Sequence, residues 1–371
     1  MADSVPLYPL YALLFAHTGL STLEISSLFA IWTVVAVVGE VPAGALADRF
    51  SRRGALVAAG VLQALGFLLW TVAPGYAVFA GGFVLWGVGG TLVSGATEAL
   101  LYDGLTAAGA EDQFTRVLGR VEAAGFVAQI PATAGAFALF SLGGYTLVGW
   151  GSVGICLAAA ALATRLPEAP RQPSEETGSY LATLRTGVVE AAREPAVRTA
   201  VLAVAGLSGV DAIDEYFPLM ARSWGIPERL VPLGVLVIML AGAAGAWLGG
   251  LVARVRLGGI AAALVTAAAL LAAAALLAAA ALLDRGASLL LAAAFYVLFR
   301  IVLVQANGRL QERIEADARA TVTSVAALGT EVSALAFIGV WSLGGAVSIA
   351  VCLAAAGTWL VLRPLRRRKR A

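Results

Sequence analysis

Long apolar runs, separated by short charged or glycine- and proline-containing breaks, dominate the sequence. About 20 apolar residues are enough to cross the hydrocarbon core of a bilayer as a helix. Strands of a membrane barrel would instead alternate polar and apolar positions over segments of about ten residues. The pattern therefore predicts an all-α polytopic membrane protein with twelve transmembrane helices, at residues 5–21, 24–47, 55–73, 76–103, 117–141, 143–164, 197–221, 228–252, 257–283, 287–310, 319–342 and 344–362.

One long polar stretch divides the twelve spans into two six-helix halves. Within it, Leu181, Leu184 and Val188 have the spacing of one helix face, which predicts an amphipathic helix on the membrane surface. The halves also resemble each other weakly, because residues 40–49 align with residues 245–254. We expect an N-terminal half, a cytoplasmic linker, a C-terminal half and a basic cytoplasmic tail that contacts anionic lipid, at residues 1–165, 166–196, 197–362 and 363–371.

The first span is shorter than the others. It carries two prolines, and no basic residue precedes it. Either coding begins upstream of Met1, so that the first helix is truncated here, or that helix is short and strained. His17, the single histidine, is expected near the outer interface, as a solvated side chain or as part of a proton relay.

Composition and the distribution of charge agree with a membrane protein. The chain is 60% hydrophobic and 13% charged, whereas a soluble domain has about 25% charged residues. If the spans alternate in direction, 21 of the 25 basic residues lie on the side of the loop that follows the second span, and three lie on the other side. Because basic loops stay in the cytoplasm, both termini and the linker are predicted to be cytoplasmic, in an inner (cell) membrane.

The loop after the second span carries the motif Gly44-Ala-Leu-Ala-Asp-Arg-Phe-Ser-Arg-Arg53. With two groups of six spans and a long central loop, this motif resembles the major facilitator superfamily (MFS). The family pattern here is Gly-x-Leu-Ala-Asp-Arg-x-Gly-Arg-Arg or -Lys, and the loop looks like that of drug exporters. Ser51 stands where a glycine is usual, which we expect to cost some turn geometry.

The resemblance, which covers essentially the whole chain, implies a gate between the two halves. Asp48 would face the N-terminus of the eleventh span near Arg319, where the helix dipole favours a carboxylate. Arg52 or Arg53 would pair with Asp103, at the end of the fourth span. The alternative is that the arginines only enforce topology. The gate residues implied are Gly44, Asp48, Arg49, Arg52, Arg53 and Asp103.

Ionisable residues inside spans are a second group of candidates, because each costs at least about 2.5–3.5 kcal/mol to insert. Arg300 and Glu331 lie about midway along the tenth and eleventh spans, so we expect them to pair, either directly or through the cavity. The pair would be either structural or functional, with Arg300 holding an anionic group and Glu331 exchanging a proton. In the seventh span, Asp211 is a candidate proton site, or part of a mouth that attracts cations.

The remaining candidates depend on helical spacing. Asp214 and Glu215 follow Asp211 by three and four residues, which would place them near it on a continuous helix. Glu40, in the second span, is the N-terminal candidate for a protonatable carboxylate. Aromatic residues could line a cavity or lie at the lipid interface; they are Tyr8, Tyr11, Trp32, Trp86, Tyr216 and Phe217.

The sequence shows no nucleophile–histidine–acid set, no metal-ligand spacing and no phosphate-binding loop. It therefore predicts no enzyme, no metal or other cofactor, and no nucleic-acid partner. The leading interpretation is a secondary active transporter in which two halves rock around a central site. Proton-coupled efflux of a small molecule, with protons as the coupling ion, is the favoured mode. The alternatives are a proton-coupled importer, and a non-transporting scaffold or sensor built on a carrier fold.

Overall fold

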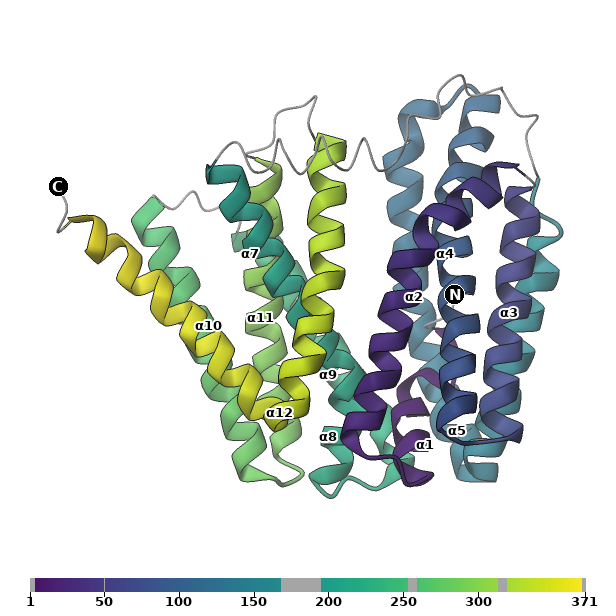
Figure 1. The fold of residues 1–371 in the computed structure, drawn as a ribbon, viewed down its shortest axis with the longest axis horizontal. Coiled ribbons are helices and arrows are strands. Elements are labelled where there is room, and N and C mark those ends of the chain that lie inside the picture. The colour runs from purple at the N-terminus through teal and green to yellow at the C-terminus, as the bar shows by residue number, and fades with distance from the viewer. Residues whose placement is uncertain (1–3, 50, 168–194, 253–258, 313–318, 369–371) are drawn as a thin grey trace. The chain divides into compact units, whose positions relative to one another are not determined.

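The computed structural model describes residues 4–49, 51–167, 195–252, 259–312 and 319–368. Helices make up nearly all of this described part, and it contains no strand (Figure 1). The all-α prediction is confirmed. The amphipathic helix predicted around residues 181–191 lies outside the described residues.

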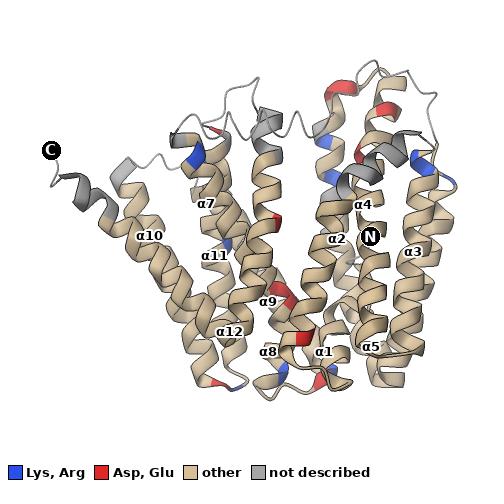
Figure 2. Ribbon diagram, viewed as in Figure 1, with Lys and Arg blue, Asp and Glu red and all other residues tan. Residues whose placement is uncertain are grey.

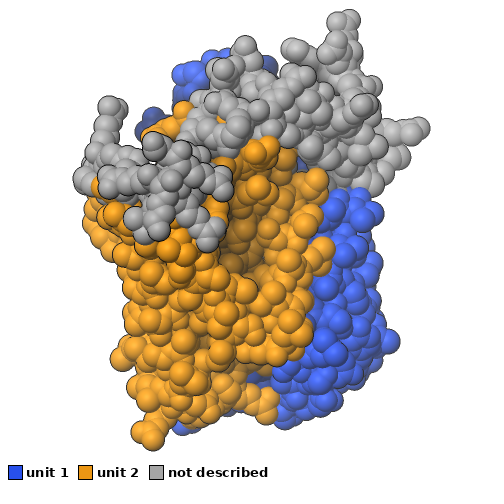
Figure 3. Space-filling model, turned by 60° about the vertical axis from the view of Figure 1, so that its left-hand side comes forward, with its two compact units in different colours: residues 1–177, 228–233 blue, residues 178–227, 234–371 orange. Residues whose placement is uncertain are grey.

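The chain folds into two compact units (Figure 3). Unit 1 comprises Met1–Thr177 together with Glu228–Leu233, and unit 2 comprises Gly178–Pro227 together with Gly234–Ala371. The helices of unit 1 are α1 Tyr11–His17, α2 Thr22–Arg49, α3 Arg52–Val72, α4 Tyr76–Ala107 and α5 Phe114–Ala163. Those that form unit 2 are α7 Pro195–Asp211, α8 Phe217–Ser223, α9 Val231–Val252 from Gly234 onward, α10 Gly259–Leu283, α11 Ser288–Gln311 and α12 Arg319–Arg368.

The helices have the dimensions of membrane spans. Within the described residues, eight are long and apolar enough to cross a bilayer. Two of these eight, α5 and α12, are each interrupted by a glycine pair, and the shorter α1, α7 and α8 supply further helical segments. Every one of the twelve predicted spans therefore contains helical backbone. Charged residues are sparse along the middle of the helices (Figure 2), as expected for a protein that crosses a membrane many times.

The interruptions of α5 and α12 are copies of one another. Both have the sequence Ser-Leu-Gly-Gly, at residues 141–144 and 342–345. The second glycine is left-handed in each, with φ of 60° at Gly144 and 58° at Gly345, a region that glycine enters without steric cost. The leucine before the glycines is 81% exposed at Leu142 and 86% exposed at Leu343. The repeated hairpin supports the internal duplication that the sequence suggested only weakly.

The first and seventh spans are not the continuous helices that the sequence predicted over 5–21 and 197–221. In unit 1 a 3₁₀ turn, Tyr8–Leu10, precedes the seven-residue α1. In unit 2 a 3₁₀ turn, Ala212–Tyr216, separates α7 from the seven-residue α8. A proline lies in the 3₁₀ turn Tyr8–Leu10 and in the first turn of α8. Because proline has no N–H and its ring clashes with the carbonyl four residues earlier, an α-helix cannot run through it undisturbed.

Glycines allow the helices to pack closely. A Cβ at Gly60 of α3 would lie 2.9 Å from the Cβ of Ala160 of α5, and one at Gly357 of α12 would lie 3.1 Å from the carbonyl oxygen of Ala267 of α10. In lipid, where apolar side chains gain little by leaving the solvent, such backbone proximity is a main source of helix–helix attraction.

Gly209 provides a direct test of this packing. A Cβ at Gly209 of α7 would overlap both the side chain and the backbone of Ser333 on α12. We therefore expect Gly209→Ala to destabilise unit 2 by about 1–3 kcal/mol, seen as a lower thermal midpoint of the purified protein. Gly206→Ala is the matched control, because a Cβ at Gly206 meets nothing within 4 Å. Equal midpoints for the two variants would contradict the close packing of α7 on α12.

Aromatic rings fill the core of unit 1. Trp70 of α3 is fully buried, and its ring contacts lie at centroid distances of 4.8 Å to Phe83 and 5.2 Å to Phe15. The indole N–H of Trp70 donates to the carbonyl oxygen of Phe79 at 3.1 Å. Four aromatic residues that the sequence could not assign between cavity and lipid interface are buried; they are Tyr11, Trp86, Tyr216 and Phe217.

Candidate functional site

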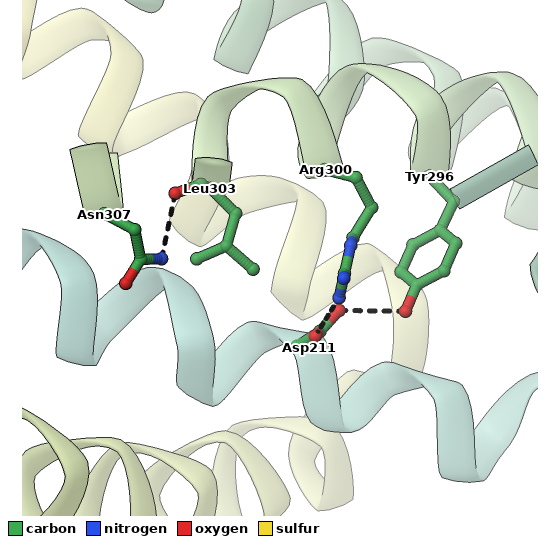
Figure 4. Close-up of polar contacts among 5 residues, drawn as sticks. All are labelled: Asp211, Tyr296, Arg300, Leu303 and Asn307. Atoms are coloured by element: carbon green, nitrogen blue, oxygen red, sulfur yellow. Dashed lines mark hydrogen bonds and ion pairs between the residues drawn. The ribbon is translucent and has the colours of Figure 1, made fainter. Parts of the chain in front are cut away.

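A charged cluster lies between two helices of unit 2 (Figure 4). The carboxylate of Asp211 forms a 2.5 Å ion pair with the guanidinium of Arg300. It also accepts a 2.9 Å hydrogen bond from the hydroxyl of Tyr296. The guanidinium carbon lies 5.9 Å from the centre of the Tyr296 ring. Both members of the ion pair are accessible, with 26% of the Arg300 side chain and 28% of the Asp211 side chain exposed.

The local fold explains why these groups meet. Asp211 is the last residue of α7, at the point where the helix gives way to a 3₁₀ turn. Tyr296 and Arg300 lie one turn apart near the middle of α11, so both side chains point to the same face of that helix. Breaks within membrane helices often lie at sites where ions and substrates bind. The cluster combines such a break with a carboxylate, a guanidinium and a phenol.

The direct partner of Arg300 differs from the one predicted, and pairing with Glu331 through the cavity stays a prediction. The sequence predicted Glu331 of α12, on the basis of equal depth, whereas Arg300 is paired with Asp211 of α7. The depth of a residue in the membrane can be counted along the sequence, but the neighbouring helix that its side chain faces cannot. Glu331 is half-buried on α12 and takes part in other interactions.

The predicted grouping of three acids in the seventh span rested on a continuous α-helix. Asp214 and Glu215 instead lie on the 3₁₀ turn, where the α-helical spacing argument does not apply. Both are half-buried and have interactions of their own. Of the three acids, Asp211 is the one in contact with Arg300.

Tyr296 was missed by the sequence interpretation. The sequence did carry a signal for this residue: Tyr296 bears a hydroxyl inside an apolar run, and it lies four positions before Arg300, the only basic residue deep in a predicted span. In a helix that spacing places two side chains side by side, so the tyrosine could have been grouped with Arg300.

The loop motif of unit 1 contributes a second ion pair. Of the two arginines expected to reach Asp103, Arg52 does so, and it also donates to the carbonyl oxygen of Ala99 at 2.9 Å. Arg53 is exposed, with a guanidinium N–H 3.5 Å from the carbonyl oxygen of Leu166. The ion pair therefore connects the start of α3 to the end of α4.

The expected cost of Ser51 is absent. Ser51 has an extended backbone, with φ of −166°, which any residue can adopt. Its hydroxyl accepts a 2.8 Å hydrogen bond from the N–H of Gly54 and so caps the N-terminus of α3. Serine is among the residues that satisfy the free N–H groups of a helix start best, so the departure from the family pattern supplies a cap.

The remaining predicted site residues of unit 1 lie on α1 and α2. Glu40, Gly44, Asp48 and Arg49 belong to the backbone of α2, and the side chains of Glu40, Asp48 and Arg49 lie outside the described part of the structure. His17 is exposed at the end of α1, and its ring lies 5.4 Å from that of Tyr145. Among the described residues, no group of three His, Cys, Asp or Glu side chains is arranged to hold a metal ion.

Solved transporter structures share this fold. A point mutant of the nucleoside transporter NupG superposes with a TM-score of 0.72 at 13% identity, over 98% of this chain and 95% of that one. A D-xylose-proton symporter gives 0.64 at 15% identity, over 97% and 92% of the two chains. An auto-inhibited POT family peptide transporter gives 0.64 at 14% identity, over 100% and 95%.

A search of curated protein sequences finds no significant match. A sequence model of the Major Facilitator Superfamily, in contrast, matches residues 1–338. That match covers unit 1 and most of unit 2, and it agrees with the helical fold. This multi-pass membrane protein therefore belongs to the major facilitator superfamily.

Proposed function

We propose that the protein is a proton-coupled secondary transporter of a small molecule, with Asp211 as the carboxylate that carries the proton. The observation behind this proposal is the cluster of Asp211, Arg300 and Tyr296 at the break after α7. Ionisable groups inside a membrane protein are costly to insert and usually mark a substrate path or a proton relay. A purely structural pair would not need to stay accessible, whereas about a quarter of each side chain is exposed here, 26% of Arg300 and 28% of Asp211.

The chemistry follows from the contacts of the Asp211 carboxylate. When ionised, it neutralises Arg300 and accepts the Tyr296 hydroxyl. When protonated, it no longer balances the guanidinium charge, and the pair weakens. A conformational equilibrium of the two units that depends on this pair would then respond to proton binding, as alternating access requires. Glu40, Asp214 and Glu331 stay proposed as further proton sites.

Efflux is the direction we propose, because the loop between α2 and α3 resembles that of drug exporters. Import is the second candidate, since a D-xylose-proton symporter shares the fold. The two modes differ in the sign of coupling: an exporter exchanges protons for its substrate, whereas an importer moves both in the same direction.

Proton flux in proteoliposomes under an imposed pH gradient tests the proposal, using cationic, neutral and anionic compounds. We expect a compound-dependent proton movement whose sign gives the mode of coupling. Compound transport with no proton movement would contradict proton coupling and indicate a uniporter. The absence of both, in protein shown to be folded, would favour the scaffold or sensor alternative.

The motif of unit 1 is proposed as a cytoplasmic gate. It would comprise Gly44, Asp48, Arg49, Arg52, Arg53 and Asp103. Its arginines would then serve the conformational cycle as well as topology, with both termini cytoplasmic and the protein in an inner membrane. Reporter fusions at the two termini test that orientation, and external exposure of either terminus would contradict it.

Asp103→Asn tests the gate. Loss of a partly exposed ion pair is worth about 0.5–1 kcal/mol, so we expect a roughly two- to fivefold shift toward the cytoplasm-open state. Labelling of an engineered cytoplasmic cysteine in the intact protein measures the shift. Asp112→Asn is the matched control, because Asp112 is exposed on the turn before α5. If the two variants label at the same rate, the ion pair does not serve as a gate.

A further inference from the structure

The contacts of Arg300 show unused hydrogen-bonding capacity. A guanidinium has five N–H donors arranged as a planar fork, and among the described residues its hydrogen-bond partner is Asp211 alone, through one nitrogen. The Nε atom of Arg300 is shielded from solvent and has no partner in the described part of the chain. A buried donor of this kind costs about 1–3 kcal/mol if it stays unsatisfied.

We propose that Arg300 binds the carboxylate of the transported molecule, so that the substrate is a small organic acid. The inference rests on the proposed transport function and names the substrate class. A carboxylate has two oxygens that match the guanidinium fork. It can therefore accept the donors that the single contact with Asp211 leaves unused.

Charge balance couples substrate binding at Arg300 to protonation of Asp211. If Asp211 takes up a proton, Arg300 keeps its charge and loses its counter-ion, which is unfavourable away from bulk water. A substrate carboxylate restores neutrality at the same guanidinium. Proton binding and anion binding therefore favour one another, which fits movement of both in the same direction, the import mode of the proposed function, better than exchange of one for the other. Other titratable groups on the elements that contact α7 include Asp214 and Glu215 on the 3₁₀ turn, Glu331 on α12 and Arg309 on α11, each with interactions of its own.

The face of α11 around Arg300 suggests the shape of the molecule. Tyr296, Arg300, Leu303 and Asn307 follow one another along this face (Figure 4). Leu303 is apolar, and Asn307 is exposed beyond it, with its amide nitrogen donating to the carbonyl oxygen of Leu303 at 3.0 Å. Arg300 and Asn307 are seven residues apart, or about 10 Å along a helix. Leu303 is only 7% exposed, so the groups that a substrate could reach along this face are Arg300, for its carboxylate, and Asn307, for a polar end.

Probe compounds that share one ring system but differ in charge separate the effect of ligand charge from that of ligand shape. Indole-3-acetate, indole-3-acetamide and tryptamine share one ring system and differ in being anionic, neutral and cationic; benzoate, benzamide and benzylamine form a second set. Binding to the full-length protein is measured by ligand-induced thermal stabilisation, at mildly acidic and mildly alkaline pH. For the wild-type protein we expect the acid of a set to bind roughly tenfold more tightly than its amide, the gain typical of a charge-assisted fork, and mainly at acidic pH.

Three variants make the test decisive. Asp211→Asn imitates the protonated state, so it should select the acid at both pH values. Arg300→Lys keeps the charge without the fork and should lose most of the selectivity, and Arg300→Gln should lose all of it. Preference for the amide or amine, acid selectivity that survives in Arg300→Gln, or no acid-selective stabilisation of Asp211→Asn would each overturn the inference. Proton-coupled flux of amines or amides alone would leave the transport function intact and exclude the organic acid, whereas acid-selective binding without proton flux would do the reverse.

Discussion

Replacing Asp211 with asparagine is expected to abolish proton-coupled net transport while leaving the protein folded. Asparagine has nearly the shape of a protonated aspartic acid and can still accept hydrogen bonds from Arg300 and Tyr296. It cannot release a proton. Because the proposed cycle requires that release in every turnover, we expect net flux driven by a pH gradient to fall by at least ~100-fold. Exchange of substrate for substrate, which needs no net proton movement, should persist.

The prediction is tested by measuring net flux driven by a pH gradient and substrate-for-substrate exchange in the same proteoliposomes. Asp284→Asn is the control: the same chemical change in the turn after α10, where Asp284 has φ of 44°, a left-handed conformation that asparagine also tolerates. Asp211→Glu should keep part of the coupled flux, because it retains an ionisable carboxylate. Normal coupled flux in Asp211→Asn would rule out Asp211 as the proton carrier.

Replacing Trp70 with alanine is expected to have the largest effect on stability. The ring is fully buried in unit 1 and contacts six other aromatic residues: Tyr11, Phe15, Phe67, Phe79, Phe83 and Trp86. Loss of a buried tryptophan costs about 3–5 kcal/mol in a water-soluble core. We expect about 3 kcal/mol here, because a side chain that leaves a membrane-protein core for lipid stays in apolar surroundings and loses mainly its packing.

Thermal unfolding of the purified protein measures this loss. Trp150→Ala is the matched control, because Trp150 of α5 is 50% exposed and its removal leaves no enclosed cavity. Trp70→Phe should be intermediate: it keeps an aromatic ring but leaves the carbonyl oxygen of Phe79 without its 3.1 Å donor. Equal midpoints for Trp70→Ala and Trp150→Ala would show that the aromatic core does not hold unit 1 together.

Helix positions could be predicted from the sequence because length and apolarity alone define a span. The predicted boundary between 117–141 and 143–164 lies at the kink at Gly143 and Gly144, and the one between 319–342 and 344–362 lies at Gly344 and Gly345. Polar breaks and glycines in the sequence indicate where the chain turns between spans. The 3₁₀ turn after Asp211 could have been found in the same way, from Pro218.

Partner choice could not be predicted in this way. A membrane helix is apolar on nearly every side, so its sequence lacks the polar stripe that reveals which face of a water-soluble helix is buried. Residue counting gives Arg300 and Glu331 a similar depth in the membrane, but it does not define how each helix is rotated about its axis. The structure supplies that rotation, and with it the pairing of Arg300 with Asp211 and Tyr296. The hydroxyl of Ser51 illustrates the same limit, because its role as a cap depends on the backbone around it.

The repeated Ser-Leu-Gly-Gly hairpins offer a pair of equivalent labelling positions. Leu142 and Leu343 project from hairpins with nearly the same backbone, one in each unit, and their side chains are almost fully exposed. Spin labels attached at these two sites should have similar local mobility and perturb packing little. A change in the distance between them, measured with and without substrate and at different pH, would then report motion of one unit against the other and not rearrangement of the label.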